Sequence, residues 1–270
     1  MRASLGQNFL TNENIAEKIV KSAGLSSRDN VLEIGPGKGI LTKYLARYAA
    51  KVLATEIDKG VCKICDNIIY KQGLSNKAKI IEGDILKIDL PKLIEENNFQ
   101  NYKVVANLPY YITSPIIRLL LETKYPPGEM ILMVQKEVGE RICAKPGQES
   151  ILSISVKFYA EPELLFSVSR ENFQPAPEVD SVVIRITRKK NPPKADAREF
   201  FSLVRAGFSS KRKMLVNNLS SSFHLTKTQL SETLKKAGLR PTQRAQELEL
   251  EDWLSLYQIW PNFITGQKRK

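Results

Sequence analysis

The chain has 270 residues, enough for one large domain and one small one, and its hydrophobic fraction of 42% and charged fraction of 26% are those of a folded protein. Its net charge of +12 is compatible with a polyanionic partner. No apolar run is long enough to cross a membrane and no secretory leader opens the sequence, so we expect a cytoplasmic protein without a membrane span.

Strand patterns and helix patterns alternate in the first part of the chain. Short apolar runs that end in turn residues are typical of buried strands, and amphipathic segments separate them. This alternation favours an α/β fold with a mostly parallel sheet and helices on both faces. The expected strands are 30–35, 51–58, 78–84, 103–110 and 130–135, and the expected helices are 38–49, 59–72 and 114–123.

Two further strand patterns, at 163–169 and 181–187, are joined by the proline-rich segment FQPAPEVD. They predict an antiparallel hairpin at the edge of the sheet, because proline is tolerated at turns and edges. The segment RKKNPPKAD at 188–196 breaks regular structure and is typical of a linker. We therefore expect a first domain at residues 1–187 and a second at residues 188–270.

The second domain is predicted to be small, all-helical and basic. Residues 188–270 carry 17 Lys and Arg against 7 Asp and Glu, a net charge of +10, whereas the first domain is nearly neutral. This contrast is typical of a reaction domain joined to a domain that binds a polyanion, and a surface that serves solubility alone is the alternative. The expected helices are 197–208, 227–237 and 249–259, followed by a disordered tail at 266–270.

The loop after the first strand combines glycines with a carboxylate. Gly35, Gly37 and Gly39 let the backbone turn tightly and approach a ligand without an intervening Cβ. A dinucleotide loop would read GxGxxG and hold a diphosphate, whereas this loop reads GxGxG and has Glu33 two residues ahead of it. The carboxylate suits a nucleoside cofactor with a positively charged end, and a simple tight turn is the alternative.

Carboxylates also stand at the ends of the second and third strands. Glu56 could accept hydrogen bonds from both ribose hydroxyls of a nucleoside, and Asp84 could accept one from an adenine amino group. Because the carboxyl ends of parallel strands meet at one crevice, these side chains together predict a nucleoside pocket.

Few side chains suited to metal binding are present. Cys62 and Cys65 form an isolated CxxC pair in a predicted helix, which favours buried free thiols over a metal or redox site. The only histidine, His224, cannot build a multi-histidine centre and has no nucleophile signature nearby. We therefore predict no metal site.

The segment NLPYY at the end of the fourth strand is the motif that points most specifically to a function. The lone pair of an aromatic amine is delocalised into the ring, so an enzyme that methylates it must accept hydrogen bonds from its N–H groups. The Asn107 side-chain oxygen and the Leu108 carbonyl can accept them. Pro109 stiffens the turn, and Tyr110 offers a face on which a base can stack. Phe173 could cover the other face of the base, with a place in the core as the alternative.

These motifs resemble those of the ribosomal RNA adenine dimethyltransferases, the dimethyladenosine transferases of small-subunit (16S) RNA. The resemblance spans almost the whole chain. It implies a class I methyltransferase fold with a helical C-terminal domain, S-adenosylmethionine as cofactor, and dimethylation of two adjacent adenines near the RNA 3′ end. The matching strings are LGQNFL at 5–10, VLEIGPGKGILT at 31–42, EID at 56–58, GDIL at 83–86, NLPYYITSPII at 107–117, FQPAPEVDSVV at 173–183 and FSSKRKMLVNNL at 208–219.

The resemblance also implies roles for individual residues. Tyr110 and Phe173 would stack the target base, and Asn107 would serve both the cofactor and the target amine. We further predict that the basic run at 211–213 touches RNA phosphates, with a solvated surface as the alternative. The expected cofactor contacts are Asn8, Leu10, Gly35, Gly37, Glu56, Asp84 and Asn107, and the expected phosphate contacts are Lys211, Arg212 and Lys213.

Other functions stay open on the sequence alone. Related enzymes that confer macrolide resistance methylate large-subunit RNA, but this chain has NLPYY and PEVDS rather than their NIPY and PKVNS forms. An assembly factor that binds RNA without relying on catalysis, and a small-molecule or DNA methyltransferase, are further alternatives. We favour a monomeric enzyme that acts on small-subunit ribosomal RNA in the pre-30S particle during ribosome biogenesis.

Overall fold

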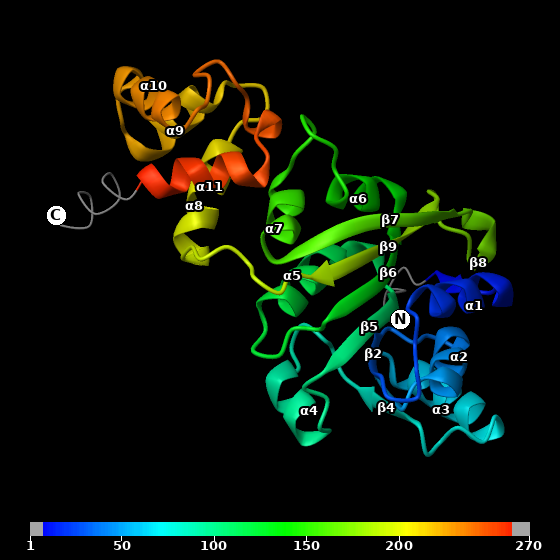
Figure 1. The fold of residues 1–270 in the computed structure, drawn as a ribbon. Helices are drawn as coiled ribbons and strands as arrows, with labels where there is room; N and C mark the ends of the chain where they lie inside the picture. Colours follow the sequence, from blue (N-terminus) through cyan, green and yellow to red (C-terminus); the bar gives the residue numbers. More distant parts are fainter. Residues whose placement is uncertain (1–7, 261–270) are drawn as a thin grey trace. The chain divides into compact units, whose positions relative to one another are not determined.

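A computed structural model describes residues 8–260, so the predicted tail at 266–270 lies outside the described residues. Those residues form a seven-stranded sheet of order β4-β3-β2-β5-β6-β9-β7 and a two-stranded ribbon of β1 and β8 (Figure 1). The strands are β1 Phe9–Leu10, β2 Asn30–Ile34, β3 Lys51–Glu56, β4 Ala78–Glu82, β5 Tyr102–Asn107, β6 Glu129–Gln135, β7 Ala160–Val168, β8 Phe173–Gln174 and β9 Ser181–Arg188.

Helices connect these strands and make up the C-terminal part of the chain. The α-helices are α1 Glu13–Ser22, α2 Ile40–Tyr48, α3 Lys59–Lys71, α4 Leu90–Glu96, α5 Thr113–Glu122, α6 Lys136–Ile142, α7 Ile151–Tyr159, α8 Ala197–Gly207, α9 Leu215–Phe223, α10 Lys227–Lys236 and α11 Leu250–Ile259. Three short 3-10 helices are η1 Tyr110–Ile112, η2 Arg170–Asn172 and η3 Ala245–Glu247. Within residues 8–260 no helix is long and apolar enough to span a membrane.

The central sheet has the predicted mixture of parallel and antiparallel strands. β2 pairs in parallel with β3 and β5, and further parallel pairs join β3 to β4 and β5 to β6. β9 is antiparallel to both β6 and β7, so the predicted antiparallel pair is confirmed, with β7 outermost. The carboxyl ends of β2, β3, β4 and β5 consequently lie along one edge of the sheet, where a ligand crevice is expected.

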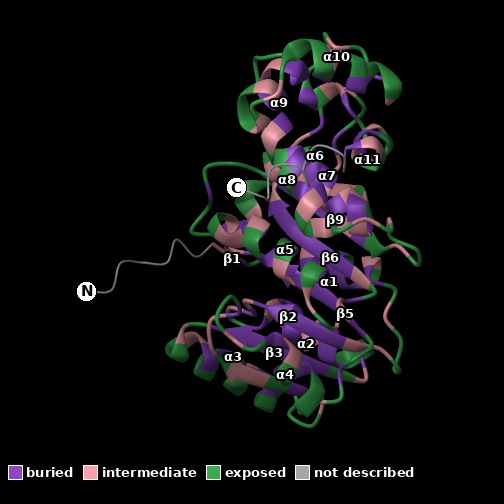
Figure 2. Ribbon diagram, turned by 90° about the vertical axis from the view of Figure 1, so that its left-hand side faces the viewer, coloured by how far each residue is buried: buried purple, intermediate pink, exposed green. Residues whose placement is uncertain are grey.

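The strands form because their apolar side chains are buried on both faces. Val31 and Leu32 of β2, and Val104 and Val105 of β5, are all 0% exposed. Buried residues fill the middle of the sheet, and exposed residues lie mainly on the outer sides of the helices (Figure 2). Helices α1, α2 and α3 cover one face and α4 and α5 cover the other (Figure 1). Both helix layers exclude water from the sheet and leave its carboxyl edge for binding.

The two-stranded ribbon was not predicted, and it holds Phe9 and Leu10 against Phe173 and Gln174. Phe9 pairs with Gln174 and Leu10 with Phe173 in antiparallel register. The Thr11 N–H donates to the Asn172 carbonyl at 2.8 Å. A two-residue strand has no periodicity that a sequence pattern could reveal. The ribbon joins the LGQNFL and FQPAPEVD motifs, which are far apart in the chain.

The described chain divides into two compact units. One unit contains residues up to Glu140 together with Ala160–Lys189, and the other contains Arg141–Tyr159 together with the residues after Lys189. The segment that holds α7 therefore groups with the C-terminal helices, although we expected it in the first domain. The reason is packing, because Ile154 and Phe158 of α7 belong to the same hydrophobic cluster as Phe200 of α8.

Candidate active site

The glycine loop between β2 and α2 has a backbone that only glycine adopts easily. Gly35, Gly37 and Gly39 have φ angles of 67°, 55° and 80°. A Cβ at Gly37 would lie 3.0 Å from Cδ1 of Phe9, which packs on the loop. The Gly35 N–H donates to the Thr55 carbonyl of β3 at 2.9 Å. The loop is thus held by β1 and β3, and its glycines expose backbone without side chains to the crevice.

Two buried glutamates lie under this loop. Glu56 is 4% exposed, and its two carboxylate oxygens accept from the N–H groups of Gly37 at 3.3 Å and Asp58 at 3.1 Å. Glu33 is 1% exposed, and its Oε2 has no hydrogen-bond partner among the described residues. Burial, opposed by a hydrogen bond with Thr42 and reinforced by the charge of Glu56, raises the pKa of Glu33 to about 8. Burial also raises the pKa of Glu56.

The third carboxylate of the crevice, that of Asp84, is more exposed to solvent than those of Glu33 and Glu56. Asp84 follows β4, and its Oδ1 accepts from the Leu86 N–H at 3.0 Å. Its Oδ2 lies 3.6 Å from the Lys87 ammonium, and its side chain is 23% exposed. These contacts hold the carboxylate at the end of its strand, while its partial exposure leaves acceptor capacity for a ligand.

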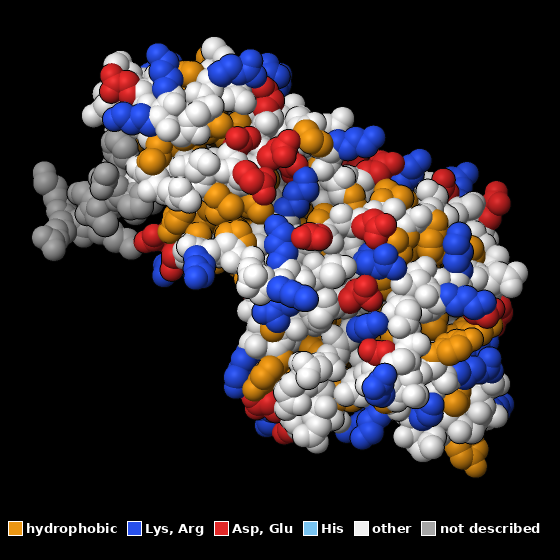
Figure 3. Space-filling model, in the orientation of Figure 1, with side chains coloured by type: hydrophobic (Ala, Val, Ile, Leu, Met, Phe, Trp, Pro, Cys, Tyr) orange, Lys and Arg blue, Asp and Glu red, His pale blue; other side chains and the backbone are white. Residues whose placement is uncertain are grey.

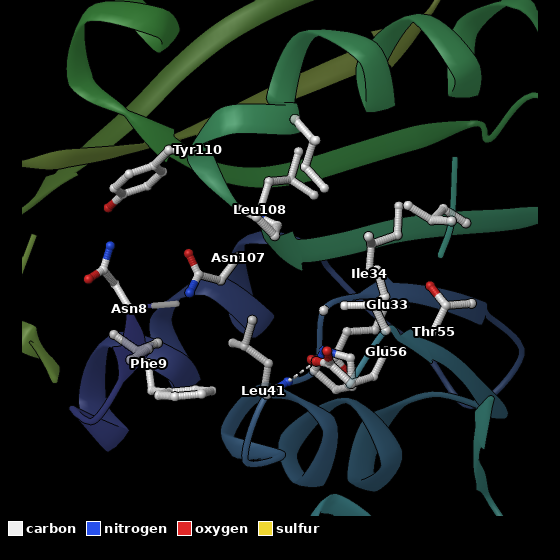
Figure 4. Close-up of a pocket in the computed structure, with 18 of the residues that line it drawn as sticks. Asn8, Phe9, Glu33, Ile34, Leu41, Thr55, Glu56, Asn107, Leu108 and Tyr110 are labelled. Carbon is white, nitrogen blue, oxygen red and sulfur yellow. Dashed lines mark hydrogen bonds between the residues drawn. The ribbon is translucent and has the colours of Figure 1, made fainter. Parts of the chain in front are cut away.

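The NLPYY segment begins at the carboxyl end of β5. Asn107 is the last residue of the strand, and the Leu108 N–H donates to the Met133 carbonyl of β6 at 3.1 Å. Pro109, with a φ of −57°, then starts the 3-10 turn that carries Tyr110. Figure 4 shows Asn107 of β5, Tyr110 of η1 and Asn8, which precedes β1, projecting toward the same space. The strand end therefore places an amide and an aromatic ring next to each other.

These residues enclose one cleft, whose empty volume including its open mouth is about 1120 Å³. All seven predicted cofactor contacts line it, and so do four of the five residues predicted to act on the base. The former are Asn8, Leu10, Gly35, Gly37, Glu56, Asp84 and Asn107, and the latter are Asn107, Leu108, Pro109 and Tyr110.

Of the five residues predicted to act on the base, Phe173 is the one that does not line the cleft. Its side chain is 4% exposed and belongs to the hydrophobic cluster that also contains Leu10, its partner in the ribbon. The placement matches the alternative of a core residue. A role in stacking the base would require Phe173 to turn out of the core, and this role stays a prediction.

Several apolar residues of the cleft were not predicted. Ile57 is 46% exposed, Leu86 is 40% exposed and Tyr111 is 61% exposed, and all three line the cleft. Ile57 directly follows Glu56, and Leu86 comes two residues after Asp84. The sequence signal for these residues was an apolar side chain one or two positions after a carboxylate that ends or follows a strand. Such a side chain gives a nucleoside pocket an apolar wall beside its polar contacts.

The basic run at 211–213 lies in the loop between α8 and α9. Lys211, Arg212 and Lys213 are exposed. The side chain of Asn218 fixes the backbone of this loop, because its Nδ2 donates to the carbonyl of Gly207 at 2.6 Å and to that of Ser210 at 2.9 Å. On the face shown in Figure 3, Lys and Arg side chains are scattered among acidic ones.

The cysteines and the histidine take no part in the cleft. Cys62 and Cys65 are buried free thiols, and burial raises their pKa values to about 11 and about 12. His224 ends α9 in the left-handed conformation with a φ of 55°. No group of three or more His, Cys, Asp or Glu side chains in the described ranges is arranged to hold a metal ion.

Known proteins share sequence similarity with this chain over more than nine-tenths of its length. A family model described as ribosomal RNA adenine dimethylase matches residues 1–261. The ribosomal RNA small subunit methyltransferase A of Geobacillus thermodenitrificans is 42% identical over 264 residues, which cover 94% of this chain and 89% of the relative. A protein of the same name from Streptococcus thermophilus is 41% identical over 266 residues, with coverage of 94% and 90%.

Two solved structures are also similar. A dimethyladenosine transferase from Plasmodium falciparum aligns with a TM-score of 0.82 at 29% identity, over 94% of this chain and 98% of that one. The 23S rRNA methyltransferase ErmE aligns with a TM-score of 0.74 at 26% identity, over 93% and 99%. These matches confirm the expected fold class, a methyltransferase sheet with additional C-terminal helices.

Proposed function

Because the chain belongs to the ribosomal RNA adenine dimethylase family, we propose that it dimethylates the N6 amino groups of two adjacent adenines near the 3′ end of small-subunit ribosomal RNA. The methyl donor of this family is S-adenosylmethionine. The two relatives described above, at 42% and 41% identity, are both named small-subunit methyltransferases. The observation that supports the proposal most is the cleft, where the Asn-Leu acceptor pair stands beside the glycine loop and the strand-end carboxylates.

The donor set of the cleft fits a nucleoside cofactor with a cationic end. Gly35 and Gly37 leave room for close approach of a ligand to the backbone, and the unpartnered oxygen of Glu33 offers an acceptor to a cation. Glu56 would bind the ribose hydroxyls and Asp84 the adenine amino group. When bound, S-adenosylmethionine supplies an electrophilic methyl group.

The NLPYY segment would hold the target base. The side-chain oxygen of Asn107 and the carbonyl of Leu108 would accept the two amine hydrogens of adenine, which aims the nitrogen lone pair at the methyl group. Tyr110 would stack on the base and Pro109 would keep the turn stiff. Alignment is the main contribution of these residues, since the methylated nitrogen is acidic enough to lose its proton to water.

The helical C-terminal part would bind the RNA itself. Lys211, Arg212 and Lys213 are exposed in a loop whose backbone is held by Asn218, so their charges can approach phosphates without rearrangement of the loop. In this proposal residues 1–187 bind the cofactor and residues 188–270 are the RNA-binding domain. The pre-30S particle as substrate, a cytoplasmic location and a monomeric state belong to the same proposal.

A methylation assay on isolated subunits tests the proposal. The protein is incubated with labelled S-adenosylmethionine and with small subunits that lack the modification, and the digested RNA is examined for N6,N6-dimethyladenosine. We expect label in two dimethyladenosines per subunit. Small subunits that remain unlabelled under these conditions would contradict the proposal.

Large-subunit RNA is the second candidate substrate, because ErmE, a 23S rRNA methyltransferase, shares the fold. The same assay with large subunits or protein-free 23S RNA separates the two candidates. We expect incorporation into small subunits to exceed incorporation into large subunits by at least about 100-fold. A reversed preference would assign the chain to the large subunit.

A further inference from the structure

The serine that ends the FQPAPEVDS motif is buried beside the tyrosine assigned to the base. Ser181 is 0% exposed, and its Oγ lies 2.6 Å from the hydroxyl oxygen of Tyr110. The two residues are 71 positions apart in the chain and begin different elements, β9 and η1. This contact links two motifs of the sequence, and neither the cofactor contacts nor the acceptor pair accounts for it.

Ser181 is fixed in place by the sheet. It pairs with Gln135 of β6 on one side and with Val168 of β7 on the other. Just before it, the Asp180 carbonyl accepts from the Lys136 N–H at 3.0 Å. A residue held by strands on both sides has little freedom to move, so its hydroxyl is a fixed partner for Tyr110, which lines the cleft.

Tyr110 depends more on its side-chain contact. It lies in a three-residue 3-10 turn that has no side-chain cap, directly after Pro109. Its ring is joined to this turn at one end and to Ser181 at the other. Because hydrogen bonds at a phenolic oxygen favour the plane of the ring, a partner at a fixed point selects both the position and the plane of the ring.

We propose that Ser181 is a positioning residue for methyl transfer, which holds the ring of Tyr110 in the orientation that stacks the target adenine. The proposal rests on the function proposed above for the cleft. It gives the serine of the FQPAPEVDS motif a role that acts through Tyr110, and no contact between Ser181 and RNA or cofactor is required.

A double-mutant cycle tests this role. Ser181→Ala and Tyr110→Phe each remove the same hydrogen bond, so each is expected to lower kcat for RNA methylation about 3- to 10-fold. The KM for S-adenosylmethionine should stay within about 2-fold, and the double variant should be no slower than the slower single variant. Losses that multiply in the double variant would overturn the proposal.

Two controls separate positioning from general stability. Tyr110→Phe changes a partly exposed side chain and leaves Ser181 in the core, so it tests the contact even if Ser181→Ala folds poorly. Ser153→Ala is the matched control, because Ser153 is also 0% exposed and its hydroxyl donates to the Ser150 carbonyl at 2.9 Å. We expect it to lower thermal stability without lowering kcat, and an equal loss of kcat would overturn the proposal.

A measurement that needs no methylation distinguishes this proposal from the function on which it rests. With 3-fluorotyrosine in place of the nine tyrosines, the Tyr110 signal in the 19F NMR spectrum is identified by its loss in Tyr110→Phe. Ser181→Ala should shift that signal and leave the other eight nearly unmoved. An unmoved Tyr110 signal would overturn the positioning role, whereas a wild-type protein that labels no adenine would contradict the proposed function alone.

Discussion

The cleft and the basic loop between α8 and α9 place their ionisable side chains in opposite surroundings. Glu33 and Glu56 are 1% and 4% exposed beneath the glycine loop, whereas Lys211, Arg212 and Lys213 are exposed to solvent. Buried carboxyl groups act through contacts of fixed geometry and are screened little by salt, whereas the interactions of exposed charges are strongly screened by salt. Changes in the cleft should therefore give large effects at any salt concentration, and changes in the basic loop should give smaller effects that vary with salt.

The largest effect is expected at the acceptor pair. Asn107→Ala removes one acceptor of the target amine and should lower the rate of methylation by about 100-fold or more, because alignment of the amine is lost. The initial rate with small subunits at saturating S-adenosylmethionine measures this. Asn101→Ala is the control, since Asn101 is exposed and directly precedes the amino end of the same strand. Full activity of Asn107→Ala would disprove the assigned role.

The next effect is expected on cofactor affinity. Glu56→Gln keeps the shape of the side chain but removes the charge that would bind the ribose hydroxyls, so the Kd for S-adenosylhomocysteine should rise about 10- to 50-fold. Isothermal titration calorimetry measures the change. Glu82→Gln is a close control, because Glu82 is exposed and pairs directly with Glu56 across β3 and β4. If the two variants bind equally, Glu56 does not hold the ribose.

Glu33 should make the stability of the α/β unit depend on pH. Its carboxyl faces Glu56 of β3, Thr42 of α2 and Cys65 of α3, and its pKa is raised from an ordinary value of 4.5 to about 8. Between these two values the folded state binds more protons than the unfolded state, so stability falls as pH rises.

We expect the free energy of unfolding to drop by about 2 kcal/mol between pH 6 and pH 8 without cofactor. Glu33→Gln should lose less stability over the same interval, because its side chain does not ionise. Urea denaturation at the two pH values measures both. The exposed Glu82→Gln variant should follow the wild type, and a Glu33→Gln slope equal to the wild-type slope would contradict the argument.

The smallest effect is expected in the basic loop. Changing Lys211, Arg212 and Lys213 together to alanine should weaken RNA binding about 10-fold near physiological salt and reduce the salt dependence of the logarithm of affinity by about 2 units of slope. Binding at several salt concentrations measures the slope. Cofactor affinity should not change, which distinguishes this loop from the cleft. An unchanged slope would show that these side chains do not contact phosphates.

The parts of the site that the sequence predicted are those encoded by short local motifs. Glu56 and Asn107 end a strand, and Gly35 and Asp84 lie just after one. A right-handed parallel sheet brings strand ends to one edge without further information. The alternation of apolar runs and amphipathic segments likewise predicted the strands β2 to β6 and the helices α2, α3 and α5, whereas α1, α4, α6, α7 and α9 were not predicted. Such features depend on residues that are neighbours in the chain.

The parts that were missed depend on contacts between distant segments. The pairing of β1 with β8 and the hydrogen bond between Tyr110 and Ser181 join residues 71 or more positions apart. The grouping of α7 with the C-terminal helices likewise reflects the packing of Phe158 against Phe200, with ring centroids 4.9 Å apart. Sequence patterns describe which face of an element is apolar, but they do not name the partner that covers it.

A crystal structure with S-adenosylhomocysteine and adenosine would test the central claim most directly. We predict that the cofactor product lies along Gly35, Glu56 and Asp84, and that the adenosine amino group lies within hydrogen-bond distance of both the Asn107 side-chain oxygen and the Leu108 carbonyl. An adenosine bound outside this cleft, or an Asn107 side chain turned away from its amino group, would contradict the account.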